Sequence, residues 1–185
     1  MDGSSSKPAR NAGLTGKTII RARRPDEIDM CVGVLADVHA ADGYPLCWPA
    51  DPPKWLAPDH LLAAWVAEYE TAVSGHVALC SAVGDSAASL WSAASGLPPE
   101  HIAAVAKLFV APSARGRGLG AALLAQACAE ARLRGLLPAL EVLDHDRGAI
   151  ALYERTGWRH VASVPAPWAR ASGGPSSLHY YRAPN

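Results

Sequence analysis

The stretch Arg115–Gly120 combines arginine and glycine in a pattern that suits phosphate binding. Its three glycines let the backbone approach a ligand closely. A helix that begins just after them would leave its first N–H groups without intrahelical acceptors, and the positive end of its dipole attracts anions. Arg115 and Arg117 add planar cationic donors that match a phosphate. The stretch predicts a seat for the phosphates of a nucleotide-bearing cofactor; the alternative is a helix start with incidental solvated arginines.

A dinucleotide-binding turn is a second interpretation of the same loop. Gly116, Gly118 and Ala121 fit its G-x-G-x-x-A pattern, and Glu141 follows about twenty residues later. That pattern requires the first glycine almost directly after a strand, whereas residues 111–115, including a proline, intervene here. A predicted hairpin also precedes the loop, and the pattern belongs to mainly parallel sheets. We therefore reject a dinucleotide-binding fold.

The elements that must position this loop are strands and helices of ordinary length. Apolar runs of strand length alternate with amphipathic stretches bounded by glycine or proline. They predict strands over Thr18–Arg23, Leu61–Tyr69, Thr71–Ala82, Ile102–Val110, Pro138–Leu143, Trp158–Val164 and Leu178–Arg182, and helices from Pro25, over Leu119–Leu133 and over Asp146–Thr156. The three strands before the loop predict an antiparallel meander. Because a whole helix separates Ile102–Val110 from Pro138–Leu143, that pair is predicted to be parallel.

Two connecting segments have an unusual composition. Ala41–Pro58 holds five prolines and two tryptophans among eighteen residues, which excludes a regular strand or a long helix and predicts an ordered loop. Trp48 and Trp55 on this loop either line a ligand site or pack against one edge of the core. Gly84–Glu100 is rich in Ser, Gly and Pro and is predicted to connect two strands.

Composition limits the classes of partner. The chain of 185 residues predicts a disordered tail over residues 1–17 and one domain over residues 18–185. Seventeen basic and seventeen acidic residues cancel, so no nucleic-acid partner is predicted. The four cysteines are scattered, which predicts neither a disulfide set nor a metal site and favours a cytoplasmic protein with reduced thiols. No apolar run is long enough for a membrane span.

Two motifs at this spacing resemble those of one protein family. Arg115-Gly-Arg-Gly-Leu-Gly120, preceded by Val110-Ala-Pro, matches R/Q-x-x-G-x-G/A, and Ala149-Ile-Ala-Leu-Tyr-Glu-Arg-Thr-Gly-Trp158 matches A-x-x-L-Y-x-x-x-G-F/W. With the predicted order of elements, residues 18–182 resemble the GNAT N-acetyltransferase superfamily. The resemblance implies an α/β (α+β) fold with a mixed sheet of about seven strands, mostly antiparallel, flanked by helices. Its splayed parallel pair would be about 102–110 and 138–143.

The resemblance also implies acetyl-CoA as cofactor and gives roles by position. Cofactor contacts would come from Leu108, Phe109 and Val110 on the pantetheine arm, and from Arg115, Gly116, Arg117, Gly118, Leu119 and Gly120 on the pyrophosphate. Tyr153 would protonate the leaving CoA thiolate, although a packed core aromatic is the alternative. The N–H of Val110 could hold the oxyanion. Asp146 stands where many members carry Asn, and an ionised carboxylate cannot donate a hydrogen bond, so this contact is in doubt.

Amine acetylation requires a base or a desolvating pocket, because an amine of pKa about 10.4 is neutral only about 0.04% of the time at pH 7. Some family members carry a glutamate base on the strand before the glycine loop, but Ile102–Val110 has no acid. His76 is the first candidate, followed by Glu68 and His145. A strand histidine such as His76 is otherwise a packed core residue.

The acceptor side is predicted from the aromatic residues of two loops, Ala41–Pro58 and Pro165–Ser177, through contacts with Tyr44, Trp48, Trp55 and Trp168. We expect acetyl transfer from acetyl-CoA to the primary amine of a small molecule, by direct attack in a ternary complex. A protein lysine or N-terminus is the alternative acceptor. A non-catalytic acyl-CoA-binding regulatory module is the alternative of another class. A homodimer is common in the family, but no residue here identifies an interface.

Overall fold

A mixed sheet of seven strands forms the centre of the computed structural model, which describes residues 17–169 and 176–184. The strands are β1 (Thr18–Ala22), β2 (Leu61–Tyr69), β3 (Ala72–Ser81), β4 (Ile102–Val110), β5 (Leu137–Leu143), β6 (Arg159–Pro165) and β7 (Ser177–Arg182). Their spatial order is β1-β2-β3-β4-β5-β7-β6, and β4–β5 is the parallel pair. The predicted mixed, mostly antiparallel sheet is confirmed.

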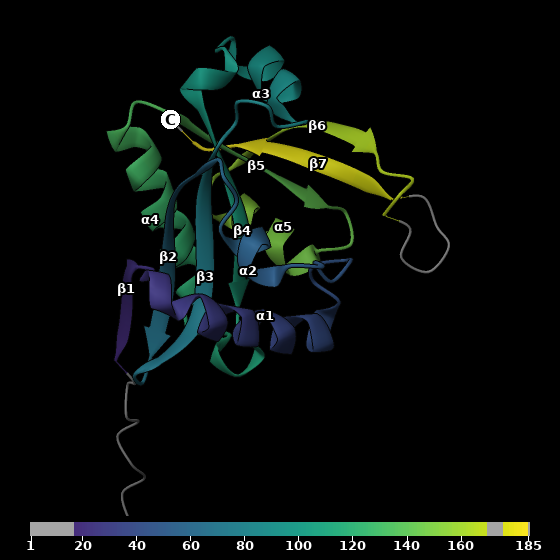
Figure 1. The fold of residues 1–185 in the computed structure, drawn as a ribbon. Helices are drawn as coiled ribbons and strands as arrows, with labels where there is room; N and C mark the ends of the chain where they lie inside the picture. Colours follow the sequence, from purple (N-terminus) through teal and green to yellow (C-terminus); the bar gives the residue numbers. More distant parts are fainter. Residues whose placement is uncertain (1–16, 170–175, 185) are drawn as a thin grey trace, which may run out of the picture.

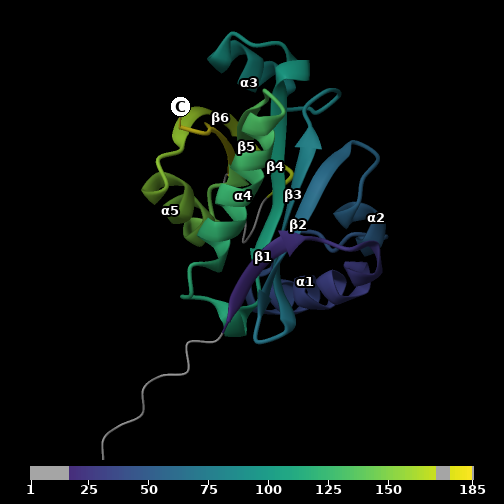
Figure 2. The ribbon, with the colours of Figure 1, turned by 90° about the vertical axis from the view of Figure 1, so that its left-hand side faces the viewer.

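Helices cover both faces of this sheet. Figure 2 shows α1 (Ile28–Asp42) and α2 (Pro52–Leu56) on one face, and α4 (Leu119–Leu133) and α5 (Arg147–Arg155) on the other. The helix α3 (Ala88–Ser95) lies at one end of the molecule, near the start of β4 (Figure 1). Three single 3₁₀ turns precede α1, β4 and the glycine loop, at Pro25–Glu27, Pro99–His101 and Pro112–Ala114.

The apolar spacing of α1 explains where this helix packs and ends. Cys31, Leu35 and Val38 recur at helical intervals and are buried in one core cluster with Phe109 of β4. The helix ends at Gly43, whose φ of +73° lies in the left-handed region that a glycine adopts without a Cβ clash. The chain then turns into the loop that leads to α2.

The parallel strands β4 and β5 pair only where both begin. Three residue pairs join them, namely Ile102 with Leu137, Ala103 with Pro138 and Ala104 with Ala139. Beyond these pairs β4 continues along β3 and β5 continues along β7. Figure 1 shows the two strands diverging from this shared start. One edge of each strand therefore has no strand partner beyond this point, and we call the space between the two edges the wedge. The predicted splayed parallel pair is confirmed.

A β-bulge lies in the part of β4 that borders the wedge. His76 pairs with Phe109 and Ala78 with Ala106, so Lys107 and Leu108 together stand opposite one residue of β3. Lys107 has a φ of +53°, which is uncommon for a residue with a side chain. Bulges bend a strand and change the direction in which its side chains point. This bulge reverses the side-chain alternation just before the glycine loop.

Two helices lie where the sequence predicts connections. The five-residue α2 interrupts Ala41–Pro58; it starts at Pro52, and the Asp51 side chain accepts a hydrogen bond from the Lys54 N–H at 2.9 Å. The second is α3, within Gly84–Glu100, which buries Trp91. Of the predicted tail, only Lys17 is among the described residues. Residues 170–175 of the predicted loop Pro165–Ser177 also lie outside the described residues.

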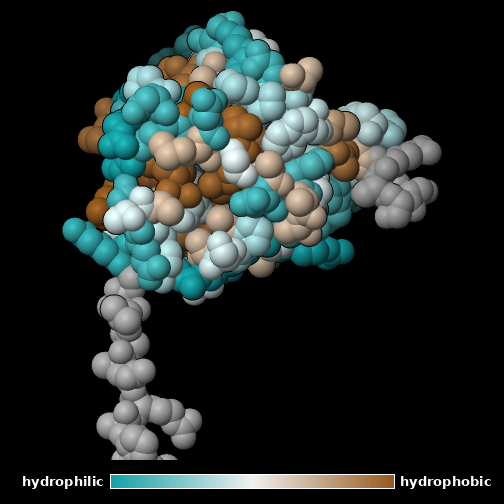
Figure 3. Space-filling model, turned by 60° about the horizontal axis from the view of Figure 1, so that its bottom comes forward, coloured by the Kyte–Doolittle hydropathy of each residue, from teal (hydrophilic) through white to brown (hydrophobic). Residues whose placement is uncertain are grey.

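The described helices include none that is long and apolar enough to cross a membrane. Figure 3 shows one face of the molecule, on which apolar residues are bordered by hydrophilic ones. Among the described residues, the large apolar side chains that are exposed come from separate elements and include Met30 of α1, Leu133 of α4 and Trp168. The main apolar surface is inside, in clusters on both faces of the sheet.

Candidate functional site

A cavity of about 1060 Å³ opens at the wedge. Its walls come from the end of α1 and the loop after it, from β4, from the glycine loop with the start of α4, and from β5 and α5. Small-molecule sites usually measure roughly 300–1,000 Å³, so this cavity is large enough for an extended ligand. It brings together most of the residues that the two sequence motifs single out.

The glycine loop has the backbone shape expected of an anion seat. Gly116 and Gly118 have φ values of +76° and +77°, and α4 begins directly after Gly118. The first helical bond runs from the Ala122 N–H to the Gly118 carbonyl at 3.0 Å, so the preceding N–H groups of α4 have no intrahelical acceptor. These groups lie at the cavity wall with the positive end of the helix dipole. The local geometry therefore favours an anion here.

The two arginines of this loop have different surroundings. Arg115 lines the cavity, and its guanidinium pairs with both carboxylate oxygens of Asp42 at the end of α1. Arg117 instead donates to the carbonyls of Ser113 and Arg115 at 2.9 and 3.0 Å, and its guanidinium lies 4.7 Å from the ring centre of Tyr69. Arg117 does not line the cavity. In this arrangement the Arg117 side chain stabilises the glycine loop through these hydrogen bonds and does not point into the cavity.

The edge of β4 that faces the wedge carries backbone groups suited to an amide-bearing ligand. Residues 104–110 all line the cavity, including the predicted contacts Leu108, Phe109 and Val110. The Ala111 N–H donates to the Ser74 carbonyl on the β3 side at 2.8 Å. Because successive N–H groups of an extended strand point in opposite directions, the Val110 N–H faces the wedge. It is therefore placed as a donor toward the cavity.

Tyr153 of α5 reaches the cavity from the opposite side of the sheet to α1. Its ring is buried and lies 6.0 Å, centre to centre, from both Trp158 and Tyr181. Burial, with a smaller effect from Asp146, raises the pKa of its phenol. Tyr44, from the loop after α1, lines the same cavity, and burial together with Tyr153 and Asp146 raises its pKa as well. The two phenols keep their protons at neutral pH.

Asp146 and His145 follow the end of β5 and line the cavity beside Tyr153. Asp146 occupies the residue before α5, but its side chain makes no capping hydrogen bond. Burial raises the pKa of its carboxyl, with Asp42 and Asp144 adding to the effect and His145 opposing it. Asp146 is therefore the N-terminal cap of α5 by position only. His145 is one of the three predicted bases, and it is the one that lines the cavity.

The two other predicted bases lie elsewhere. His76 is fully buried under the Phe109 ring; its Nδ1 lies 3.0 Å from the Lys107 carbonyl and its Nε2 lies 3.0 Å from Arg23 Nη1. Burial lowers the pKa of His76 to about 3. Glu68 accepts hydrogen bonds from Arg21 at 3.0 and 2.8 Å. Neither residue lines the cavity, which argues against a role as general base.

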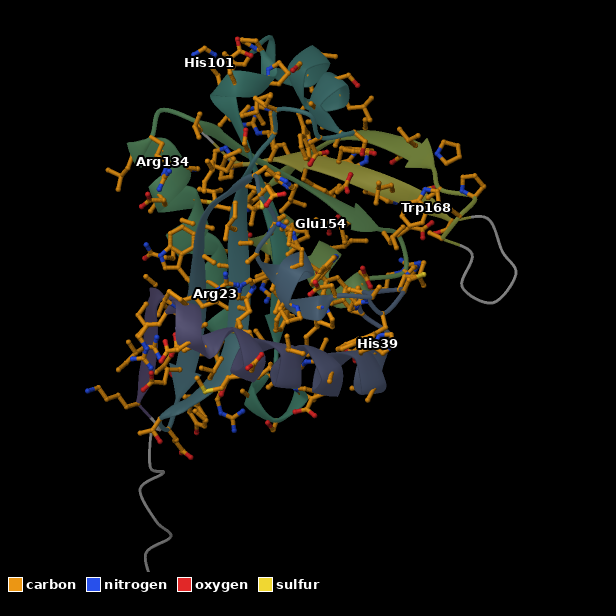
Figure 4. The ribbon with its side chains drawn as sticks, in the orientation of Figure 1. Arg23, His39, His101, Arg134, Glu154 and Trp168 are labelled. Atoms are coloured by element: carbon orange, nitrogen blue, oxygen red, sulfur yellow. The ribbon has the colours of Figure 1, made fainter. Side chains whose placement is uncertain are left out.

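Three of the four predicted acceptor aromatics line the cavity, namely Tyr44, Trp55 and Trp168. Tyr44 and Trp55 meet edge to face with ring centres 6.3 Å apart. Trp48 instead packs on His39 of α1, with ring centres 5.3 Å apart, and does not line the cavity. Figure 4 shows Trp168 near the ends of β6 and β7, and His39 on α1. The ligand-wall interpretation therefore fits Trp55 better than Trp48.

Sequence reasoning missed six charged residues of the cavity, which are Asp42, Asp85, Lys107, Glu141, Arg147 and Arg155. The Lys107 Nζ lies 5.2 Å from the Trp55 ring centre, and burial lowers the pKa of its ammonium. Glu141 is the one charged residue in the otherwise apolar strand β5. That isolated acid was the available signal, but only the topology shows that it faces the wedge.

These features together form a cavity between two separating strands, with an anion-favouring helix start at one of its walls. Residues 35–158 match the model of the Acetyltransferase (GNAT) family. Structures with similar folds include an N-acetyltransferase from Staphylococcus aureus, at 18% identity over 90% of this chain and 97% of that chain, with a TM-score of 0.68. The ribosomal-protein-S18-alanine N-acetyltransferase from Escherichia coli has 17% identity over 91% and 94%, with a TM-score of 0.67.

A protein from Salmonella typhimurium, assigned as an acetyltransferase and solved with its cofactor acetyl-CoA, has 18% identity over 89% of this chain and 92% of that chain, with a TM-score of 0.65. No curated protein sequence matches the chain. The chain belongs to the GNAT acetyltransferase family, because the family model covers well over half of its length.

Proposed function

We propose that this protein transfers the acetyl group of acetyl-CoA to the primary amine of a small molecule, by direct attack in a ternary complex. The observation that carries the proposal is the cavity at the wedge, which runs from the anion seat at the start of α4 to aromatic walls on the α1 side. A direct transfer needs both ligands in one continuous space, and this cavity supplies it.

The residues on the cofactor side fit acetyl-CoA. The N–H groups at the start of α4 suit a pyrophosphate. The backbone edge of β4 beyond Ala104, which has no partner in β5, suits the amide groups of a pantetheine arm. At Gly120 a Cβ would make only ordinary contacts, 3.4 Å from Leu152 and 3.8 Å from Val110, so this glycine is not required by packing within the protein. When bound, acetyl-CoA supplies the activated acetyl group.

Two groups of this chain act on the reacting atoms. The Val110 N–H donates to the carbonyl oxygen as negative charge develops on it, and this donor needs no reorganisation because the strand holds it. The Tyr153 phenol donates a proton to the departing sulfur. Its raised pKa keeps the proton in place until the thiolate forms, since a buried phenol does not ionise at neutral pH. Asp146, beside this phenol, contributes to that effect.

The acceptor side is formed by Tyr44 on the loop after α1 and Trp55 on α2, with Trp168 also at the cavity wall. Rigid aromatic side chains on a proline-rich loop provide a wall at low entropic cost. A walled cavity of this kind favours a small amine over an extended polypeptide. Dimer formation stays a prediction, and no surface of the described residues identifies a partner copy.

The test mixes protein, acetyl-CoA and a panel of primary amines while free thiol is measured. Release of one thiol for each acetylated amine, with no release for matched tertiary amines, is the expected result. Peptides with a free N-terminus or lysine form a separate arm. Acetylation of the peptides alone would favour a protein acceptor. Tight cofactor binding without thiol release for any acceptor would contradict the enzyme proposal and favour a binding module.

A further inference from the structure

We infer that the acceptor is an amine that also carries a carboxylate, and that Lys107 of β4 binds this carboxylate. The inference rests on the proposed function, because it names the class of amine that the cavity takes. Lys107 lines the cavity, and its Nζ lies 5.2 Å from the ring centre of Trp55. Trp55 in turn meets Tyr44 edge to face. Lys107 therefore adds a cation to the two aromatic walls of the acceptor side.

The bulge of β4 turns the Lys107 side chain toward these walls. In a regular strand Lys107 would share the face of Val105, which is buried in the core cluster that contains the α4 side chains. The bulge reverses this alternation, and the side chain instead reaches Trp55 of α2. Figure 2 shows α2 and α4 on opposite faces of the sheet. The bulge therefore moves a cation from the α4 side to the acceptor side.

The backbone conformation of Lys107 is unfavourable and is held by its surroundings. Its φ of +53° lies in the left-handed region, where a residue with a Cβ is strained. The Nδ1 of the fully buried His76 lies 3.0 Å from the Lys107 carbonyl oxygen, and the His76 ring stacks on Phe109. Strain that is held in this way is concentrated at ligand sites. The observed strain therefore points to a use for the Lys107 side chain.

The Lys107 ammonium takes part in no ion pair among the described residues. The other lysine and arginine residues of the cavity differ from it. Arg115 pairs with Asp42, and Arg147 and Arg155 are exposed on α5, whereas Lys107 is partly buried. A partly buried charge is stabilised by an opposite charge. At a cavity wall, a bound ligand can supply that charge.

The groups around the ammonium leave it short of negative charge. Burial lowers the pKa of Lys107, and Arg23 acts in the same direction, while Cys80 and Asp85 oppose the shift. The Arg23 guanidinium is fixed nearby, because it donates to the Leu56 carbonyl at 3.1 Å. A ligand carboxylate beside the Lys107 Nζ would favour the charged form and raise this pKa again.

The acids of the cavity favour a zwitterion over a simple anion. Asp85 and Glu141 also line the cavity, and Asp85 acts on Lys107 from beyond ion-pair distance. Carboxylates attract an ammonium and repel a ligand that is only negative. An amine with a carboxylate presents one group of each sign, and its hydrocarbon part can pack on Trp55. The carboxylate orients the amine and takes no part in the bond changes of acetyl transfer.

The experiment compares matched amines as acceptors. Glycine, β-alanine, γ-aminobutyrate and δ-aminovalerate are each supplied as the free acid and as the primary amide, and kcat/KM is measured for both. At the best chain length the acid should exceed its amide about 10- to 100-fold, the range expected for a hydrogen bond between charged groups. That chain length reports the separation between the Lys107 ammonium and the reacting centre.

Lys107→Met should abolish the preference for the acid, mainly through a higher KM. Methionine keeps the Cβ and the length of the side chain, so the backbone strain at this position is unchanged. Lys107→Arg should restore part of the preference, which a merely structural role would not predict. The matched control is Lys54→Met on α2, because Lys54 pairs with Asp59 and does not line this cavity. It should keep the wild-type ratio of acid to amide.

Thermal unfolding checks that each variant is folded, and calorimetry measures binding of the acids to the protein with CoA present. Folded Lys107→Met that keeps the wild-type ratio, or wild-type protein that prefers the amides at every chain length, would overturn the inference. Wild-type protein that acetylates no amine of any panel would instead contradict the proposed function. The calorimetric arm then still decides the role of Lys107, since Lys107→Met should weaken binding of the best acid about 10-fold or more.

Discussion

The two halves that we propose for the cavity, one for the cofactor and one for the acceptor, are built by different means. The cofactor half is one continuous stretch, from the bulge of β4 through the glycine loop into α4, and most of its ligand groups are backbone N–H and carbonyl groups. The acceptor half is assembled from side chains of separate elements, including Trp55 of α2, Lys107 of β4 and Glu141 of β5. A backbone site depends on local glycine and strand geometry, whereas a side-chain site depends on the topology of the whole sheet.

Tyr153 lies where the two halves meet, and its substitution should have the largest effect. Tyr153→Phe removes the proton donor but keeps the ring among Trp158 and Tyr181. We expect kcat to fall about 10²- to 10⁴-fold while the Kd for CoA changes less than about 2-fold. Steady-state kinetics and calorimetric CoA binding measure the two quantities. The matched control is Tyr181→Phe, which removes a phenol from the same cluster and should leave kcat nearly unchanged. Equal losses in both variants would point to a packing role for Tyr153.

The backbone character of the cofactor half can be tested at Gly118. Gly118→Ala places a side chain on a residue with φ of +77°, and the strain of roughly 1–2 kcal/mol is relieved if the loop changes shape. Restoring the binding shape then opposes CoA binding, and we expect about a 10-fold weaker Kd. Gly96→Ala introduces the same strain at the end of α3, at φ of +74°, and Gly96 does not line the cavity. It should lower stability similarly without changing the Kd; a loss of CoA affinity in both variants would argue against a specific role for the loop.

The elements that the sequence predicts well are those set by local patterns, and the ones it misses depend on contacts between distant parts of the chain. The bounds of β4 and α4 agree with the predicted Ile102–Val110 and Leu119–Leu133, because both elements have a clear apolar pattern and end at proline or glycine signals. The connection Gly84–Glu100 does not have such a pattern. Its helix α3 is held by burial of Trp91 against Tyr180, which is a tertiary contact between residues far apart in the sequence.

The site residues differ in the same way. The cavity includes Gly116, Gly118 and Tyr153, which belong to contiguous motifs. It excludes His76, because a bulge in β4 and the ring of Phe109 enclose that side chain. It also excludes Arg117, which stacks on Tyr69 of a distant strand. Glu141 enters the site only because β5 leaves β4 after Ala139, and no single-sequence pattern reports where two strands separate.

The acceptor half can be tested with two tryptophans of one loop region. Trp55 contacts Tyr44 and Lys107 at the cavity wall, whereas Trp48 stacks on His39 outside the cavity. We expect Trp55→Leu to raise the KM for the amine about 5-fold, which corresponds to about 1 kcal/mol of aromatic contact. Trp48→Leu should leave this KM within about 2-fold. The Kd for CoA should be unchanged in both, and the reverse order of effects would move the acceptor to the Trp48 side.

The smallest effect should come from the ion pair that joins the two halves. Asp42, at the end of α1, holds the guanidinium of Arg115, and both side chains are partly exposed. An exposed pair of this kind contributes about 0–1 kcal/mol, so a phosphate can compete with Asp42 for Arg115. Asp42→Asn should tighten the Kd for CoA about 2- to 4-fold at low salt. Arg115→Ala should weaken CoA binding. Arg117→Ala should change the Kd little, because the Arg117 side chain faces Tyr69. Weaker binding in Asp42→Asn would instead mean that the carboxylate positions Arg115 for the cofactor, and the two halves would then be coupled through this pair.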